Sequence, residues 1–176
     1  MNQASWVVNV GNAVIFQVGW FLSLFFYDSS LVVLVALVMV LIANQLLSAF
    51  SRAEWFVVGV VSVAGCVMDQ LLGLMGVFEF SGGVLIPLWL VSIWIMFATL
   101  LVRSLNWLVS KKSLSVILAF LFAPLSYFSG AKLTGVSFGL SAEISMLTVA
   151  CCWALMLPAM LWITESFTSD RGCANA

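Results

Sequence analysis

Long runs of apolar residues, separated by short polar connections, dominate the pattern of the chain. Each run is about as long as the roughly 20 residues that an α-helix needs to cross a hydrocarbon core about 30 Å thick. The runs predict six membrane-spanning helices, at residues 6–27, 31–50, 55–78, 84–105, 114–138 and 144–164. We therefore expect an all-α, polytopic membrane bundle of six transmembrane helices, which forms a single integral-membrane domain over residues 1–176.

The composition supports the same class of protein. Of the 176 residues, 64% are hydrophobic and only 7% are charged, whereas a soluble domain carries about 25% charged residues. Such a chain lacks the polar residues to cover a surface that faces water. The net charge of −1 also provides no basic surface for nucleic acid, so we expect no nucleic-acid partner.

The distribution of lysine and arginine predicts the orientation of the bundle. If the N-terminus lies in the cytoplasm, the cytoplasmic side holds five of the six basic residues: Arg52, Arg103, Lys111, Lys112 and Arg171. The outer side then holds only Lys132. Because cytoplasmic loops are enriched in Lys and Arg, both termini are predicted to be cytoplasmic.

Reporter fusions test this orientation. A reporter fused after Ser113 and a second one fused at the C-terminus are both expected to lie in the cytoplasm, because both sites follow an even number of predicted spans. The measurement pairs an enzyme that is active only outside the cytoplasm with a protein that fluoresces only inside it. Either fusion on the outer side would contradict the predicted topology.

Polar side chains within the predicted spans are the first candidates for a site, because each is costly in hydrocarbon. On the first helix Asn9, Asn12, Gln17 and Trp20 fall within an arc of about 140°. Side-chain amides both donate and accept hydrogen bonds. This face therefore either binds a neighbouring helix or lines a partly hydrated cavity, and the pattern leaves both interpretations open.

The third helix concentrates small residues around one carboxylate. The residues of this face fall within an arc of about 120°. They are Gly59, Ser62, Gly65, Cys66, Asp69, Gly73 and Gly76. Small residues let helices approach closely, so this face is expected to pack centrally, with Gln70 beside Asp69. An aspartate near the bilayer centre costs about 2.5–3.5 kcal/mol. It therefore needs a proton or a partner, and its role is either structural or functional.

Two cations are candidates for contacts with a ligand or with Asp69. Arg103 is predicted near the cytoplasmic end of the fourth helix, where its side chain either extends to the interface or binds a phosphate or carboxylate headgroup. Lys132 is predicted a few ångströms above Asp69, and we expect the two to pair and close the outer end of a polar pocket. In the alternative, Lys132 extends outward and Asp69 is held by Asn12, Gln17 or Gln70.

Tryptophan positions divide into two groups. Trp6, Trp55, Trp107 and Trp162 lie near predicted helix ends, where indole rings favour the membrane interface. Trp20, Trp89, Trp94 and Trp153 lie deeper and are expected to pack inside the bundle. Trp89 and Trp94, together with Tyr127, are therefore candidate binding residues for the apolar part of a ligand.

The residues that usually carry catalysis or bind metals are scarce. The chain has no histidine, and its four cysteines form no CxxC pair. We therefore predict no metal site, no cofactor and no assigned catalytic residue. An enzyme that uses Asp69 as an acid or base, with Tyr127 or Lys132 assisting, is the weakest hypothesis.

Four segments together resemble one known family. They are FQVGW at Phe16–Trp20, Asp69 with the glycine-bearing turn after it, PLWLVSIWIMFATLLVRSLNWL at Pro87–Leu108, and APLSYFSGAKL at Ala123–Leu133. They resemble the bacterial inner-membrane family known as domain of unknown function 2878, over nearly the whole chain. The family often has arginine and a Gly-Ala pair where Lys132, Thr134 and Gly135 stand here, so the resemblance supports a cationic contact there but not an arginine-specific one.

The resemblance implies a multi-pass protein of the bacterial inner membrane. Members are frequently encoded beside enzymes that modify membrane fatty acids, which implies work on lipids, with membrane lipids and membrane-associated lipid-modifying enzymes as partners. The first hypothesis is therefore an accessory or binding protein for a lipid, a fatty acid or another hydrophobic small molecule. A transporter of a small solute or lipid is the alternative, and the sequence leaves an oligomer open.

Overall fold

A computed structural model describes residues 3–80 and 85–168 of the chain, and these residues form a helical bundle. Its elements are α1 (Gln3–Phe25), α2 (Ser30–Leu47), α3 (Arg52–Leu74), α4 (Leu88–Val102), the 3-10 helix η1 (Asn106–Ser110), α5 (Lys112–Thr134) and α6 (Ala142–Thr168). Five of these helices are long and apolar enough to cross a membrane. The expected all-α membrane bundle is confirmed.

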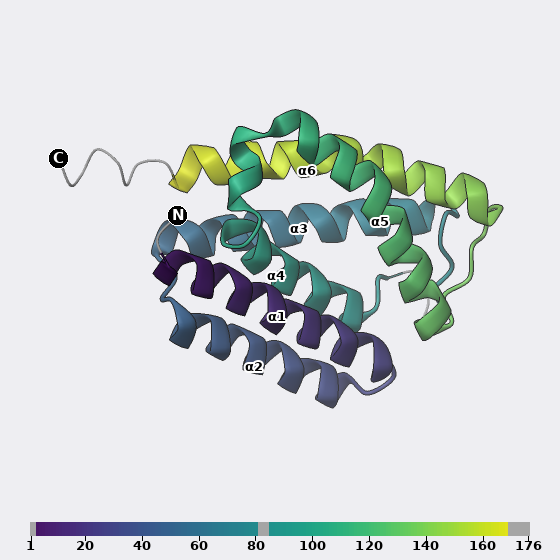
Figure 1. The fold of residues 1–176 in the computed structure, drawn as a ribbon. Coiled ribbons are helices and arrows are strands. Elements are labelled where there is room, and N and C mark those ends of the chain that lie inside the picture. Colours follow the sequence, from purple (N-terminus) through teal and green to yellow (C-terminus); the bar gives the residue numbers. More distant parts are fainter. Residues whose placement is uncertain (1–2, 81–84, 169–176) are drawn as a thin grey trace.

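The six α-helices run up and down in chain order, so the start of α1 and the end of α6 lie at the same end of the bundle (Figure 1). We call this end the termini end. At the opposite end Glu79 and Ser137 form an isolated antiparallel bridge between the α3–α4 and α5–α6 connections, and we call it the bridge end. Helix α4 contacts α1, α2, α3 and α6 and is the central helix of the fold.

The fourth predicted span, 84–105, is too long. Helix α4 has 15 residues, Leu88–Val102, or about 22 Å at 1.5 Å per residue. Pro87 is its N-cap, a position at the start of a helix where the missing N–H of proline costs no intrahelical hydrogen bond. At Arg103 the backbone leaves the helix with φ −109° and ψ −79°, and the chain turns into η1. Residue 84 lies outside the described residues.

The boundaries of α3 and α5 follow local backbone chemistry that the hydropathy pattern does not contain. Helix α3 begins earlier than predicted, because Ser51 and Glu54 form a reciprocal capping box at its first turn. It ends at Leu74, and Gly76 follows with φ +73°. Helix α5 ends at Thr134 rather than at 138, because Gly135 adopts φ +69°, a left-handed conformation that is easy only for glycine.

Candidate ligand cavity

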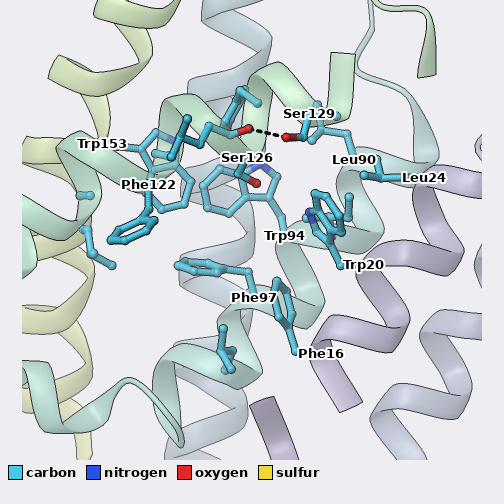
Figure 2. Close-up of a pocket in the computed structure, with 18 of the residues that line it drawn as sticks. Phe16, Trp20, Leu24, Leu90, Trp94, Phe97, Phe122, Ser126, Ser129 and Trp153 are labelled. Atoms are coloured by element: carbon cyan, nitrogen blue, oxygen red, sulfur yellow. Dashed lines mark hydrogen bonds between the residues drawn. The ribbon is translucent and has the colours of Figure 1, made fainter. Parts of the chain in front are cut away.

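A cavity of about 630 Å³ lies among α1, α4, α5 and α6. This volume is within the roughly 300–1,000 Å³ typical of small-molecule sites. Aromatic side chains dominate the wall, and Figure 2 shows several of them around the open space. They are Phe16, Trp20, Phe78, Phe80, Trp89, Trp94, Phe97, Phe122, Tyr127 and Trp153.

All four tryptophans that were predicted to lie deep line this cavity. Trp94 is only 2% exposed and Trp89 is 8% exposed. The four that were predicted near the helix ends are instead on the outside of the bundle, with Trp6, Trp107 and Trp162 exposed by 57%, 46% and 60%. The predicted division is therefore confirmed for packing, since one group lines the cavity and the other is exposed; the membrane-interface position of the exposed group stays a prediction.

The cavity opens on the outside of the bundle between α1 and α5. Five lining residues have exposed side chains, and all of them lie on these two helices: Gln17 on α1, and Phe122, Leu125, Ser126 and Ser129 on α5. Toward the bridge end the two helices approach each other, since a Cβ placed on Gly130 would lie 4.0 Å from Leu24 Cδ2. The opening therefore lies on the lateral surface of the bundle, which is the surface that contacts lipid in a membrane-spanning protein.

Asp69 stands behind this wall, fully buried on α3. Its Oδ2 accepts a 2.6 Å hydrogen bond from Trp94 Nε1, and its Oδ1 accepts a 2.7 Å hydrogen bond from the Tyr127 hydroxyl. Trp94 and Tyr127 line the cavity, whereas Asp69 does not. The carboxyl group thus fixes two wall residues from α4 and α5, and it is a positioning residue for the cavity.

Trp94 is also fixed on other sides. Its indole ring stacks on Trp153 with centroids 5.2 Å apart and an angle of 13°. Gly65 on α3 contacts the same ring so closely that an added Cβ would overlap it. The absence of a side chain at Gly65 is what lets α3 and α4 approach at this level. This close contact bears out the predicted central face of α3 at Gly65, but Gly59 on the same face has no neighbour within 4 Å of an added Cβ.

The expected Asp69–Lys132 ion pair is wrong. Lys132 is exposed on α5, and its Nζ lies over Phe128, 5.5 Å from the ring centroid. Among the described residues, the ion pairs are Arg103–Glu54 and Lys112–Glu165. Asp69 obtains its hydrogen bonds from two neutral donors instead, and none of the alternative partners Asn12, Gln17 and Gln70 is one of them.

The amides on α1 do not act together. Asn12 is buried and donates a 2.8 Å hydrogen bond to Asn44 of α2, and Asn44 in turn donates to Thr99 Oγ1 of α4 at 3.3 Å. The Ser104 hydroxyl lies 2.6 Å from Asn12 Oδ1 and 2.5 Å from the Asn9 carbonyl oxygen, so these two acceptors share its one proton. The Asn12 amide thus joins α1 to α2, Asn9 contributes only its backbone carbonyl to this cluster, and Gln17 lies at the cavity.

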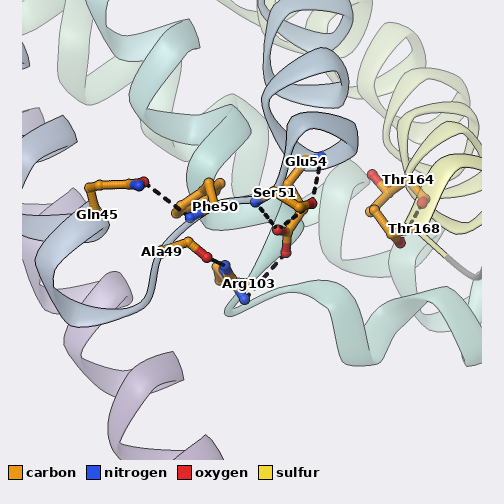
Figure 3. Close-up of polar contacts among 8 residues, drawn as sticks. All are labelled: Gln45, Ala49, Phe50, Ser51, Glu54, Arg103, Thr164 and Thr168. Carbon is orange, nitrogen blue, oxygen red and sulfur yellow. Dashed lines mark hydrogen bonds and ion pairs between the residues drawn. The ribbon is translucent and has the colours of Figure 1, made fainter. Parts of the chain in front are cut away.

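Arg103 is part of a polar cluster at the termini end (Figure 3). Its guanidinium lies 3.2 Å from Glu54, donates to the Ala49 carbonyl at 3.0 Å and stands 4.5 Å above the Phe50 ring. Glu54 is 4% exposed and also accepts from the Ser51 backbone N–H at 2.7 Å. Arg103 therefore ties α4 to the α2–α3 connection, away from the cavity lining.

Gln70 has a similar structural contact, because its Oε1 accepts a 3.1 Å hydrogen bond from the backbone N–H of Ile86, just before α4. The structure thus brings Gln17, Trp89, Trp94 and Tyr127 to one cavity, with Asp69 behind it. It places Asn9, Asn12, Gln70, Arg103 and Lys132 elsewhere.

Some residues that line the cavity or stabilise the fold were not predicted from the sequence. Phe97, Phe122 and Ser126 line the cavity, but nothing distinguishes them from other residues of apolar spans. Glu54 had a recognisable signal, the Ser-x-x-Glu pattern of a capping box. Within residues 3–80 and 85–168, no group of three or more His, Cys, Asp or Glu side chains could hold a metal ion.

Fold and cavity together define a polytopic helical membrane protein with an aromatic-lined internal cavity that opens sideways. The chain belongs to the family described as "Protein of unknown function (DUF2878)", which matches it over residues 9–159. Comparison with curated proteins and with solved structures finds no match.

Proposed function

We propose that the protein binds a lipid, or a hydrophobic molecule of similar chemistry, in the cavity between α1 and α5. The observation that carries the proposal is the combination of an apolar, aromatic wall with an opening whose exposed residues all lie on two membrane-spanning helices. A lipid in the bilayer reaches such an opening without crossing water. Because its chain is already in hydrocarbon, binding depends on van der Waals packing against the aromatic wall rather than on removal of the chain from water.

The wall is suited to holding a ligand rather than to reacting with one. Asp69, which lies behind the wall, uses both oxygens to hold Trp94 and Tyr127. A rigid aromatic wall keeps its shape when the cavity is empty, and preorganisation of this kind favours binding. We further propose that the protein acts as an accessory to membrane-associated lipid-modifying enzymes of the bacterial inner membrane, to which the family resemblance points.

Blocking the opening tests the binding role. The Ser126→Trp variant places a bulky side chain at the rim and is expected to lose most of the lipid that co-purifies with the wild-type protein, because the ligand can no longer enter. The measurement is solvent extraction of the detergent-purified protein, followed by mass spectrometry of the extracted lipids per mole of protein.

Leu121→Trp is the matched control. Leu121 lies on the same helix and is 54% exposed, but it does not line the cavity. This variant is expected to retain the wild-type lipid content, which separates cavity-bound lipid from lipid on the outer surface. Equal lipid content in both variants and the wild type would overturn the proposed binding role.

A further inference from the structure

The cavity wall carries no formal charge. None of the described residues that line it is Asp, Glu, Lys, Arg or His. The nearby carboxyl group, Asp69, supplies no positive charge in either protonation state. None of the five cations among the described residues lines the cavity. Arg103 pairs with Glu54 and Lys112 with Glu165, Lys111 and Lys132 lie over the rings of Trp107 and Phe128, and Arg52 is exposed at the start of α3. An anionic headgroup inside the cavity would therefore have no counter-ion.

Hydrogen-bonding side chains lie at the opening, about midway along α1 and α5 rather than near the helix ends. Gln17, Ser126 and Ser129 are the polar residues among the exposed lining residues, and the Ser129 hydroxyl already donates to the Leu125 carbonyl at 2.8 Å. Counted from the Leu24–Gly130 contact near the bridge end, Ser126 lies four residues away and Gln17 seven, or about 6 Å and about 10 Å along their helices. Half of a hydrocarbon core is about 15 Å, so in a bilayer whose headgroups lie level with that contact both polar groups would lie within the hydrocarbon.

A polar group of the ligand at this depth is stabilised only if it is uncharged. An amide and a hydroxyl can both donate and accept hydrogen bonds, and they therefore match a hydroxyl or a carbonyl oxygen. A phosphate or an ionised carboxylate at the same depth would lose its hydration without gaining a cation.

We propose that the cavity selects a long-chain lipid whose polar group is an uncharged hydroxyl or carbonyl, and that Gln17 and Ser126 hydrogen-bond this group. The inference rests on the proposed function and narrows its ligand. It separates neutral lipids from phospholipids and ionised fatty acids, which the bilayer supplies at the same opening.

Ligands that differ only in their polar group test this selection. The full-length protein in detergent is titrated with tritiated palmityl alcohol, and palmitate, palmityl phosphate and hexadecane are used as competitors at a pH where palmitate is ionised. Palmityl alcohol is expected to bind at least about ten-fold more tightly than either anion, because a charge at membrane depth is disfavoured by more than the energy of a ten-fold difference. Palmitate is expected to gain affinity as the pH is lowered and its carboxylate takes up a proton.

The double variant Gln17→Leu/Ser126→Ala tests the two polar residues. Its affinity for palmityl alcohol is expected to fall about five- to ten-fold, in line with the loss of about one hydrogen bond, while its affinity for hexadecane stays unchanged. Unchanged alcohol affinity in this variant would overturn the role of the two residues.

The possible failures are distinguishable. If palmitate or palmityl phosphate binds as tightly as the alcohol, and Ser126→Trp abolishes this binding, the selection is wrong and the proposed binding role stands. If none of the four ligands binds in a way that Ser126→Trp reduces, the proposed function and the inference are both wrong.

Discussion

The Gly65→Ala variant is expected to have a free energy of unfolding about 3 kcal/mol lower than the wild type, which is the upper end of the range for overpacked cores. The Cβ of an alanine at this position would overlap the indole ring of Trp94. Trp94 has little freedom to move away, because it is 2% exposed, stacks on Trp153 and donates to Asp69. Either α3 moves away from α4, or the ring leaves its hydrogen bond to the buried carboxyl group.

Gly59→Ala is the matched control on the same helix. Nothing lies within 4 Å of a Cβ at Gly59, and glycine inside a helix costs about 0.5–1 kcal/mol relative to alanine. The control is therefore expected to be slightly more stable than the wild type. Thermal unfolding in a mild detergent, followed by circular dichroism, measures both effects. Equal unfolding temperatures for the two variants would show that the Gly65–Trp94 contact does not limit the packing.

Arg103→Ala is expected to destabilise the protein by about 3 kcal/mol. Removal of one partner of a buried ion pair typically costs about 3–5 kcal/mol, because the remaining charge is uncompensated. The lower end applies here, since Glu54 keeps its two hydrogen bonds from Ser51. Unfolding by denaturant in detergent measures the change in free energy.

Two further variants test whether loss of the Arg103–Glu54 ion pair causes the destabilisation. Arg52→Ala removes an exposed arginine from the start of α3 and is expected to change stability by no more than about 0.5 kcal/mol. Glu54→Gln combined with Arg103→Ala removes both charges but retains a residue type that supports the capping box, and it is expected to recover most of the loss. If the double variant is as unstable as Arg103→Ala, the contacts of Arg103 with Ala49 and Phe50 are the main source of stability.

The helical bundle and the division of the tryptophans were predictable, because both depend on average properties of the chain. A long apolar run is enough to predict a span. Indole rings near the ends of such runs favour the interface, so Trp6 and Trp162 are exposed while Trp94 is buried. Neither prediction requires knowledge of which helices are neighbours.

The partners of polar residues were not predictable, because they depend on helix neighbours and on rotation about helix axes. Asp69 was expected to meet a cation at the same depth, but Lys132 points to the outside of α5. On the same helix Tyr127 reaches the carboxyl group. Helical position alone also grouped Asn12 with Gln17, although Asn12 binds Asn44 and Gln17 lies at the opening.

The short central helix α4 determines whether the number of helices that traverse the bundle is even or odd. Among the described residues, a count restricted to apolar helices of 18 residues or more finds five. This odd number would place the start of the first helix and the end of the last on opposite membrane faces. In the structure α4 adds one more pass through the bundle with only 15 residues, and the start of α1 and the end of α6 lie at the same end (Figure 1). Because four other helices contact α4, its apolar length need not match the bilayer thickness. A search for relatives by hydropathy should therefore accept a shortened fourth helix, because omitting it turns an even number of passes through the bundle into an odd one.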